Sequence, residues 1–243
     1  MSWIGLLLIG IGLTDLVFSV RPRAVVPECV GASVLILVGL ACDLTSATDV
    51  VALIVMAAVV VAWGQTVTRG FGRGPAWLPL VVLGVGLAGV IVVSGEAGEA
   101  GGRLQTWLDD VALPVLAGTD ADWALLLAGV LLVQLSTGNV VVRLVLAATG
   151  TMDPRRHGEP EDPEMRLKGG RLLGPMERVF IVCLGLAGYV TAASIVVAAK
   201  GLLRFPELSS RRDQDRIHQL TEYFLVGSFV SWLFALGSLV LLA

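Results

Sequence analysis

Long apolar runs recur along the whole chain, and short polar segments separate them. Seven runs of roughly 18 or more residues consist mainly of Val, Leu, Ala, Gly and Ile, the length that a helix needs to cross a hydrocarbon core of roughly 30 Å. Because only helices and closed barrels satisfy the main chain in lipid, the pattern predicts an all-α, polytopic transmembrane helix bundle with about seven spans. The predicted spans are residues 3–20, 25–42, 50–68, 76–94, 123–142, 177–199 and 222–242.

The charges in the short loops alternate in sign along the chain. Basic residues follow the first and third spans, and acidic residues follow the second and fourth. The bases are Arg21, Arg23, Arg69 and Arg73; the acids are Asp43, Asp49, Glu96, Glu99, Asp109, Asp110, Asp120 and Asp122, with Arg103 among them. Since Lys and Arg concentrate in cytoplasmic loops, we expect the amino terminus to lie outside.

The sixth run can be placed in two ways. Full crossing puts the five bases of the 200–221 loop outside, whereas re-entry raises the number of cytoplasmic bases from 11 to 16 of 17. Against re-entry, Gly174-Pro175 and Lys200-Gly201 are good start and stop signals for one helix from 175 to 200. We therefore predict a full crossing and a cytoplasmic carboxy terminus, with six spans plus a re-entrant helix as the alternative.

The chain divides into three parts. Residues 1–149 hold about five spans and a short amphipathic helix near 104–116, whose apolar face suits the outer membrane surface. Residues 150–174 form a polar cytoplasmic loop rich in Pro, Gly and charge. Residues 175–243 form a two-helix membrane unit.

Composition supports the membrane class and excludes several others. Only 15% of residues are charged, against about 25% in soluble domains. The net charge of −3 argues against a nucleic-acid partner, and the three cysteines lack the spacing of a disulfide framework or zinc site. Arginine supplies 15 of the 17 bases, which is typical of a GC-rich bacterial genome.

Four polar residues within predicted spans are candidates for a transport path. Asp15 lies in the first span, and ionisable groups inside a bilayer are costly and usually functional. Gln134, Asn139 and Arg143 cluster in and just beyond the fifth span. Such a patch either lines a path or satisfies helix-to-helix hydrogen bonds, and both interpretations stay open.

The sequence contains no recognisable enzymatic pattern. Its two histidines, His157 and His218, lie in polar loops outside any HExxH-like frame, and no nucleophile elbow, Walker loop or dinucleotide fingerprint occurs. We therefore predict no enzyme, no catalytic or metal-binding residues and no cofactor.

Three segments between about residue 138 and 235 carry a recurring pattern of small, charged and aromatic residues. They read GNVVVRLVL, then GGRLLGPMERVFIVCLGLAGYVTAASIVVAAKGLLRFPEL, then TEYFLVGSFVSWLFAL. The residues of the pattern are Gly170, Arg171, Leu172, Gly174, Glu177, Arg178, Ala198, Ala199, Lys200, Arg204, Phe205, Glu222, Tyr223, Gly227 and Ser231. With these residues the chain resembles an uncharacterised family of bacterial multi-spanning inner-membrane proteins, and the resemblance implies a membrane protein and supplies no activity.

The charged members of these segments suggest a structural role at the membrane surface. Lys200 or Arg204 is placed to pair with Glu222, or to hold lipid phosphates as juxtamembrane bases do, with Glu177 and Arg178 at the other end of the sixth span. The sequence therefore predicts a non-enzymatic inner-membrane protein that binds membrane lipid or partner membrane subunits, itself included. A small transporter or channel is the alternative.

Overall fold

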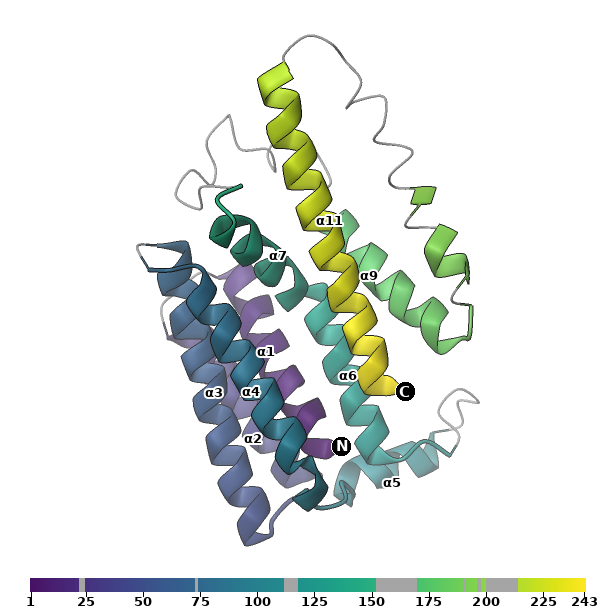
Figure 1. The fold of residues 1–243 in the computed structure, drawn as a ribbon. Coiled ribbons are helices and arrows are strands. Elements are labelled where there is room, and N and C mark those ends of the chain that lie inside the picture. The colour runs from purple at the N-terminus through teal and green to yellow at the C-terminus, as the bar shows by residue number, and fades with distance from the viewer. Residues whose placement is uncertain are drawn as a thin grey trace.

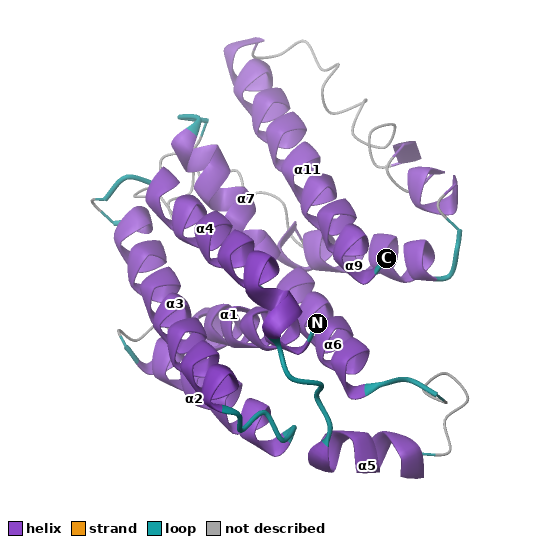
Figure 2. Ribbon diagram, turned by 60° about the horizontal axis from the view of Figure 1, so that its bottom comes forward, coloured by secondary structure: helices purple, strands orange, loops and turns teal. Residues whose placement is uncertain are grey.

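The computed structural model describes residues 1–21, 25–72, 74–111, 118–151, 170–189, 191–195, 198–199 and 214–243, and every regular element in these ranges is a helix (Figures 1 and 2). The predicted all-α class is therefore confirmed. The helices are α1 (Ser2–Val20), α2 (Val26–Ala41), α3 (Ala47–Phe71), α4 (Trp77–Val93), the 3-10 helix η1 (Ser94–Glu96), α5 (Gly102–Asp110), α6 (Ala121–Leu135), α7 (Thr137–Ala148), α9 (Gly170–Leu186) and α11 (Gln214–Leu242).

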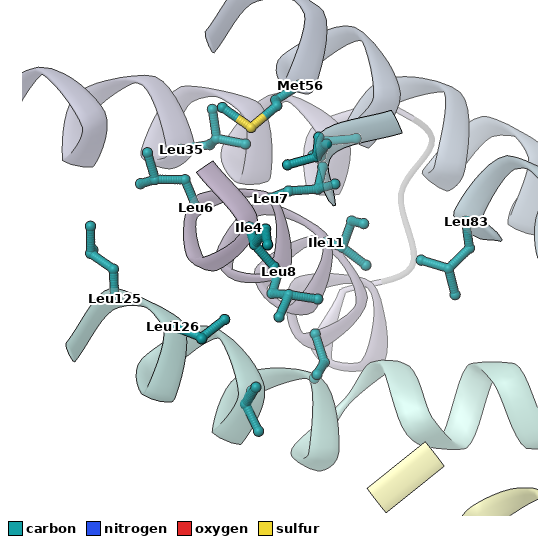
Figure 3. Packing of buried hydrophobic residues seen from close by; sticks show 14 of the residues in the cluster. Ile4, Leu6, Leu7, Leu8, Ile11, Leu35, Met56, Leu83, Leu125 and Leu126 are labelled. Carbon is teal, nitrogen blue, oxygen red and sulfur yellow. The ribbon is translucent and has the colours of Figure 1, made fainter. Parts of the chain in front are cut away.

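Helix α1 lies at the centre of the bundle. In its apolar window 61% of the residues are buried, against 17% for the span formed by α4 and η1 and 22% for that of α11. Leucines and a methionine from four neighbouring helices converge on it (Figure 3). They are Leu35 from α2, Met56 from α3, Leu83 from α4, and Leu125 and Leu126 from α6. The other helices thus turn much of their apolar surface outward, as lipid-facing helices do.

Helices α1 and α6 approach each other through paired glycines. A methyl group added at Gly5 would lie 2.6 Å from the main chain of Leu125, and one added at Gly129 would lie 2.6 Å from the Gly5 carbonyl oxygen. Only residues without a Cβ allow main chains this close, which is how small residues bring membrane helices together.

Within the described residues, four spans are long and apolar enough to cross a membrane, or five if the bent pair α6–α7 is one span. The four are Ser2–Val20, Ala47–Phe71, Trp77–Glu96 and Thr221–Leu242. Helix α2 is apolar but has only 16 residues. Most of the predicted runs therefore correspond to helices, and the described residues do not confirm the expected number of about seven crossing helices.

The sixth predicted span departs most from expectation. Instead of one helix from 175 to 200, α9 ends at Leu186, and Gly188 adopts a left-handed φ of 80°. The N–H of Tyr189 donates to the carbonyl of Leu184, and that of Gly188 to Gly185. These two hydrogen bonds, together with a glycine in the left-handed conformation, form a Schellman motif, which ends a helix. The helical residues 191–195 then run back toward the level at which α9 began (Figures 1 and 2).

Both termini lie at one end of the bundle (Figure 1), which we call the termini end; the opposite end is the loop end. The termini end also holds the α2–α3 connection, η1 and α5, since Ser2 Oγ donates to the Gly98 carbonyl at 3.1 Å and Gly101 N–H to the Cys42 carbonyl at 2.9 Å. The predicted amphipathic helix at 104–116 corresponds to α5, and residues 112–117 lie outside the described part. The predicted loop at 150–174 also lies mostly outside it.

Candidate functional site at a broken helix

The fifth predicted span is two helices, α6 and α7, bent by 49° at Ser136. The break falls in the sequence LSTGN, where Ser, Thr and Asn side chains compete for the main-chain hydrogen bonds of a helix. Ser136 Oγ lies 2.7 Å from the Gly12 carbonyl oxygen on α1 and 3.0 Å from that of Leu132. Its hydroxyl proton therefore bonds either α1 or the last turn of α6, which holds the break against the central helix.

Arg178 of α9 binds the carboxy-terminal end of α6. Its side chain is only 1% exposed. Both Nε (3.1 Å) and Nη2 (2.8 Å) donate to the Gln134 carbonyl oxygen, Nη2 also donates to Asn139 Oδ1 at 2.8 Å, and Nη1 to Ser231 Oγ at 3.1 Å. The last carbonyls of a helix lack partners within the helix and attract positive charge. Arg178 supplies both the donors and the charge, and it joins α6, α7, α9 and α11.

Gly138 makes room for the guanidinium. A methyl group at this position would overlap Arg178 Nε and lie 2.6 Å from its Cζ. A methyl group at Gly174, by contrast, would lie 3.4 Å from Arg178 Nη1 and from Asn139 Oδ1, an ordinary contact. The first turn of α7 must therefore contain a residue without a side chain at 138 for Arg178 to fit.

Asp15 of α1 lies at the other half of the break, beside the start of α7. Trp63 Nε1 of α3 donates to both carboxylate oxygens, at 3.1 and 3.2 Å. The Thr137 hydroxyl is also beside Asp15 but lacks hydrogen-bond geometry, and it is buried without a partner. In the described part of the chain Asp15 has no basic partner. A negative charge at a helix amino terminus is favourable. Each of the two helix ends at the break therefore lies beside a charge opposite to its own partial charge: Arg178 at the end of α6 and Asp15 at the start of α7.

The structure brings together most of the residues predicted to line a transport path. Gln134 and Asn139 both bind Arg178, while Asp15 lies across the break from them. The Gln134 side chain donates to Ser238 Oγ at 2.7 Å, and its Oε1 is buried without a partner. Arg143 lies over the Phe71 ring, 4.8 Å from the centroid, and so faces α3 instead of the break.

The residues predicted to contact lipid or to pair at the surface do not form one group. Arg178 is in the protein interior, so its predicted place at a membrane interface is wrong; the cause is the acceptors that the broken helix leaves open. Glu177 is half-buried, and Glu222 is exposed, with Thr151 Oγ1 at 3.5 Å from its Oε1. Lys200 and Arg204 lie outside the described residues, so their predicted pairing with Glu222 stays a prediction.

Sequence reasoning missed Trp63 as a member of this site, and it noted Thr137 and Ser231 only as parts of a polar patch and of the family resemblance. Trp63, Thr137 and Ser231 reach it only through tertiary contacts, although Thr137 belongs to the polar patch that contains Gln134 and Asn139. The three segments that carry the family resemblance each supply a part of the Arg178 site: Asn139, Arg178 itself and Ser231. That convergence is visible only in three dimensions.

The chemistry available here is that of buried, opposite charges. The described residues contain no group of three or more His, Cys, Asp and Glu side chains placed to hold a metal ion. No family model, curated protein or solved structure matches the chain. The site offers one carboxylate with a single donor, one hydroxyl without a partner and a guanidinium bound to neutral oxygens.

Proposed function

We propose that the protein is a small transporter or channel of the bacterial inner membrane, in which Asp15 binds a proton or cation beside the α6–α7 break. The observation that carries the proposal is the matching of the two new helix ends by opposite buried charges. Discontinuous helices near the midplane of secondary transporters present their ends to ions and charged substrates. Ionisable groups within spans are costly and mark ion or proton paths. Asp15, Gln134 and Asn139 line this path, and Arg143 lies beyond it.

The proposed topology has six crossings and one re-entrant hairpin. The crossings are α1, α2, α3, α4–η1, the α6–α7 pair and α11; the hairpin is α9 with the residues that follow its turn. The position of both termini at one end supports an even number of crossings. This is the alternative that the sequence left open, and, with Arg178 buried in the bundle, it gathers 15 of the other 16 bases on one side.

The proposed orientation places the termini end outside and the loop end in the cytoplasm. The acidic residues Asp43, Glu96, Glu99, Asp109, Asp110, Asp120 and Asp122 belong to elements of the termini end. Arg21 and Arg69 lie at the loop end, where the α1 and α3 helices finish. The positive-inside tendency therefore supports this orientation.

Cysteine labelling in intact cells tests the topology. In a variant without Cys29, Cys42 and Cys183, single cysteines at positions 160 and 214 should both be protected from a membrane-impermeant maleimide and both react after the membrane is opened. Labelling of the two positions from opposite sides would show a full sixth crossing and contradict the hairpin.

Proton flux into liposomes tests the activity. Purified protein is reconstituted with a trapped pH-sensitive dye, and a potassium diffusion potential is applied with valinomycin. We expect faster proton entry than in protein-free liposomes, and Asp15→Asn should return the rate to that of empty liposomes. The exposed Glu96→Gln is the matched control and should transport normally. An Asp15→Asn protein that is folded and transports like the wild type would rule out the role of Asp15.

A second candidate is a non-enzymatic protein that binds lipid, partner subunits or a second copy through its outer faces. It is favoured by glycines of α4 and α11 that point into open space: Gly84, Gly89 and Gly237 have nothing within 4 Å of an added methyl group. Gly84 with Ala88 has the spacing of a helix contact, yet α4 turns Gly84 away from the bundle. Gly84→Ile should then weaken self-association or partner capture in detergent without reducing stability.

A further inference from the structure

A second acidic side chain, Glu28 in the first turn of α2, is buried away from any base in the described residues. It is 4% exposed, and its Oε2 atom is buried without a hydrogen-bond partner. An ionised carboxylate left in this state is strongly destabilising, because nothing replaces the water that it has lost. Such a group is a candidate for carrying a proton.

Glu28 and Asp15 occupy adjoining positions in the contact among α1, α2 and α3. A methyl group at Gly64 of α3 would overlap Glu28 Cγ and lie 3.0 Å from Oε1, so the carboxyl group rests on the α3 main chain. The preceding residue of α3, Trp63, is the donor to Asp15. Each of two consecutive α3 residues therefore contacts one of the two carboxyl groups.

The contact between α1 and α2 independently places Glu28 near Asp15 along the bundle. A methyl group at Gly31 would overlap the hydroxyl of Thr14, the residue before Asp15. Gly31 lies three residues after Glu28, on the same side of α2. Along the bundle, Glu28 therefore lies about one helical turn closer to the loop end than Asp15 does.

No charged group of the described residues pairs with Glu28. On α1 this part of α2 contacts Thr14, the residue before Asp15, and on α3 Glu28 contacts Gly64. Arg21 and Arg69, at the loop ends of α1 and α3, are exposed. Helix α5 meets α2 at the opposite end, through Gly102 and the Ala41 carbonyl. Among the described residues, no base contacts either Asp15 or Glu28, and like charges held close together in a protein interior repel each other.

We propose that Glu28 is a second proton-binding group, which exchanges a proton with Asp15 on the loop-end side of the path. The O–H bond of the Asp15 carboxylic acid breaks as an O–H bond forms on the Glu28 carboxylate, directly or through one water molecule. The inference rests on the proposed function and names its substrate as the proton. It makes Asp15 and Glu28 two successive proton-binding groups of one route.

The flux assay tests the relay. Glu28→Gln keeps the size of the side chain but holds no exchangeable acid proton, and we expect it to lower proton entry at least tenfold, as Asp15→Asn does. Gly64→Ala should also lower it, because the methyl group displaces Glu28. Gly95→Ala, where the methyl group meets open space, should leave it unchanged. Normal flux through a folded Glu28→Gln protein would overturn the relay.

Infrared difference spectroscopy separates this inference from the proposed function. Titration of the detergent-purified protein should show a carboxylic-acid C=O band that Glu28→Gln removes, and that Asp15→Asn alters because the two groups share a proton. If the wild type carries no proton flux but shows this coupled band, transport is refuted and the two-carboxyl proton site stands. If Glu28→Gln removes no band, the site itself is refuted.

Discussion

Two tryptophan–aspartate hydrogen bonds join α1 and α3, and they run in opposite senses. Near the starts of both helices, Trp3 Nε1 of α1 donates to Asp49 Oδ1 of α3 at 2.9 Å. Farther along, Trp63 of α3 donates to Asp15 of α1 at 3.1 and 3.2 Å. The two hydrogen bonds hold α1 and α3 side by side and parallel. Helix α2, which connects them in the chain, must therefore run antiparallel to both.

The two aspartates differ in how completely they are satisfied. Asp49 accepts hydrogen bonds from Trp3, from the Gly98 N–H at 3.1 Å and from Ser46 Oγ at 2.6 Å. Ser46 also accepts from the Asp49 N–H, as the N-cap of α3. Asp15 has one N–H donor shared between its two oxygens. Both side chains are buried, at 3% and 4% exposed.

The two tryptophan–aspartate pairs therefore have different roles. A fully bonded buried carboxylate stabilises one arrangement of the chain, and Asp49 ties α1, α3 and the segment after η1 together at the termini end. A carboxylate with one donor retains the capacity to accept a proton or another cation. The two carboxylates are equally buried, so burial does not distinguish the structural role of Asp49 from the proposed functional role of Asp15. The number of hydrogen-bond donors to each carboxylate does.

The largest expected effect on stability is that of Asp49→Ala. It leaves the buried Trp3 and Gly98 donors without an acceptor, at about 1–3 kcal/mol each, so we expect a loss of about 2–6 kcal/mol in the free energy of unfolding. Asp120→Ala is the control, since Asp120 only caps α6 by accepting from the Trp123 N–H, and it should cost about 1 kcal/mol. Reversible unfolding in mixed detergent micelles measures both. Equal losses would contradict the structural role of Asp49.

Replacing each tryptophan by phenylalanine sharpens the comparison. Trp63→Phe removes the only N–H that donates to Asp15 among the described residues, and it should cost about 2–3 kcal/mol, as for a hydrogen bond to a charged group. Trp3→Phe leaves Asp49 with two donors and should cost about 1 kcal/mol. In a double-mutant cycle, Asp15→Asn should recover part of the Trp63→Phe loss. If Trp3→Phe lowered the free energy of unfolding more than Trp63→Phe does, the expected order of the two hydrogen bonds would be contradicted.

The smallest stability effect should come from Asp15→Asn. The asparagine carbonyl oxygen still accepts the Trp63 N–H, so we expect a change of less than about 1 kcal/mol in the free energy of unfolding. Proton flux should nevertheless be lost. A loss of stability as large as that of Asp49→Ala would show that Asp15 is a structural group after all.

The apolar runs predicted most helices well because run length and hydrophobicity are local properties. Helices α1 to α4 and the apolar part of α11 begin and end within a few residues of the predicted spans. The α6–α7 break was not predicted, although its polar residues were noted, because a polar patch is compatible with a straight helix until its partners are known. The end of α9 was missed because Gly188 is also the kind of residue that packs helices together.

The candidate site was predictable only in part. Polarity within a span pointed to Asp15, Gln134 and Asn139, and two of these bind the same guanidinium. The burial of Arg178 could not be read from its place near the start of an apolar run, where surface bases are common. It depends on a carbonyl that only the break exposes, and on the absence of a side chain at Gly138. Contacts of this kind are set by the assembled bundle.

The position of Arg178 in the chain has a consequence for biogenesis. Ribosomes release α6 and α7 first, and α9 emerges only after the polar segment that separates them. Until then the carbonyl of Gln134 lacks its guanidinium partner, because that partner has not yet been made. A nascent chain halted before α9 should consequently be handed to insertion factors or proteases more readily than one arrested a few dozen residues later.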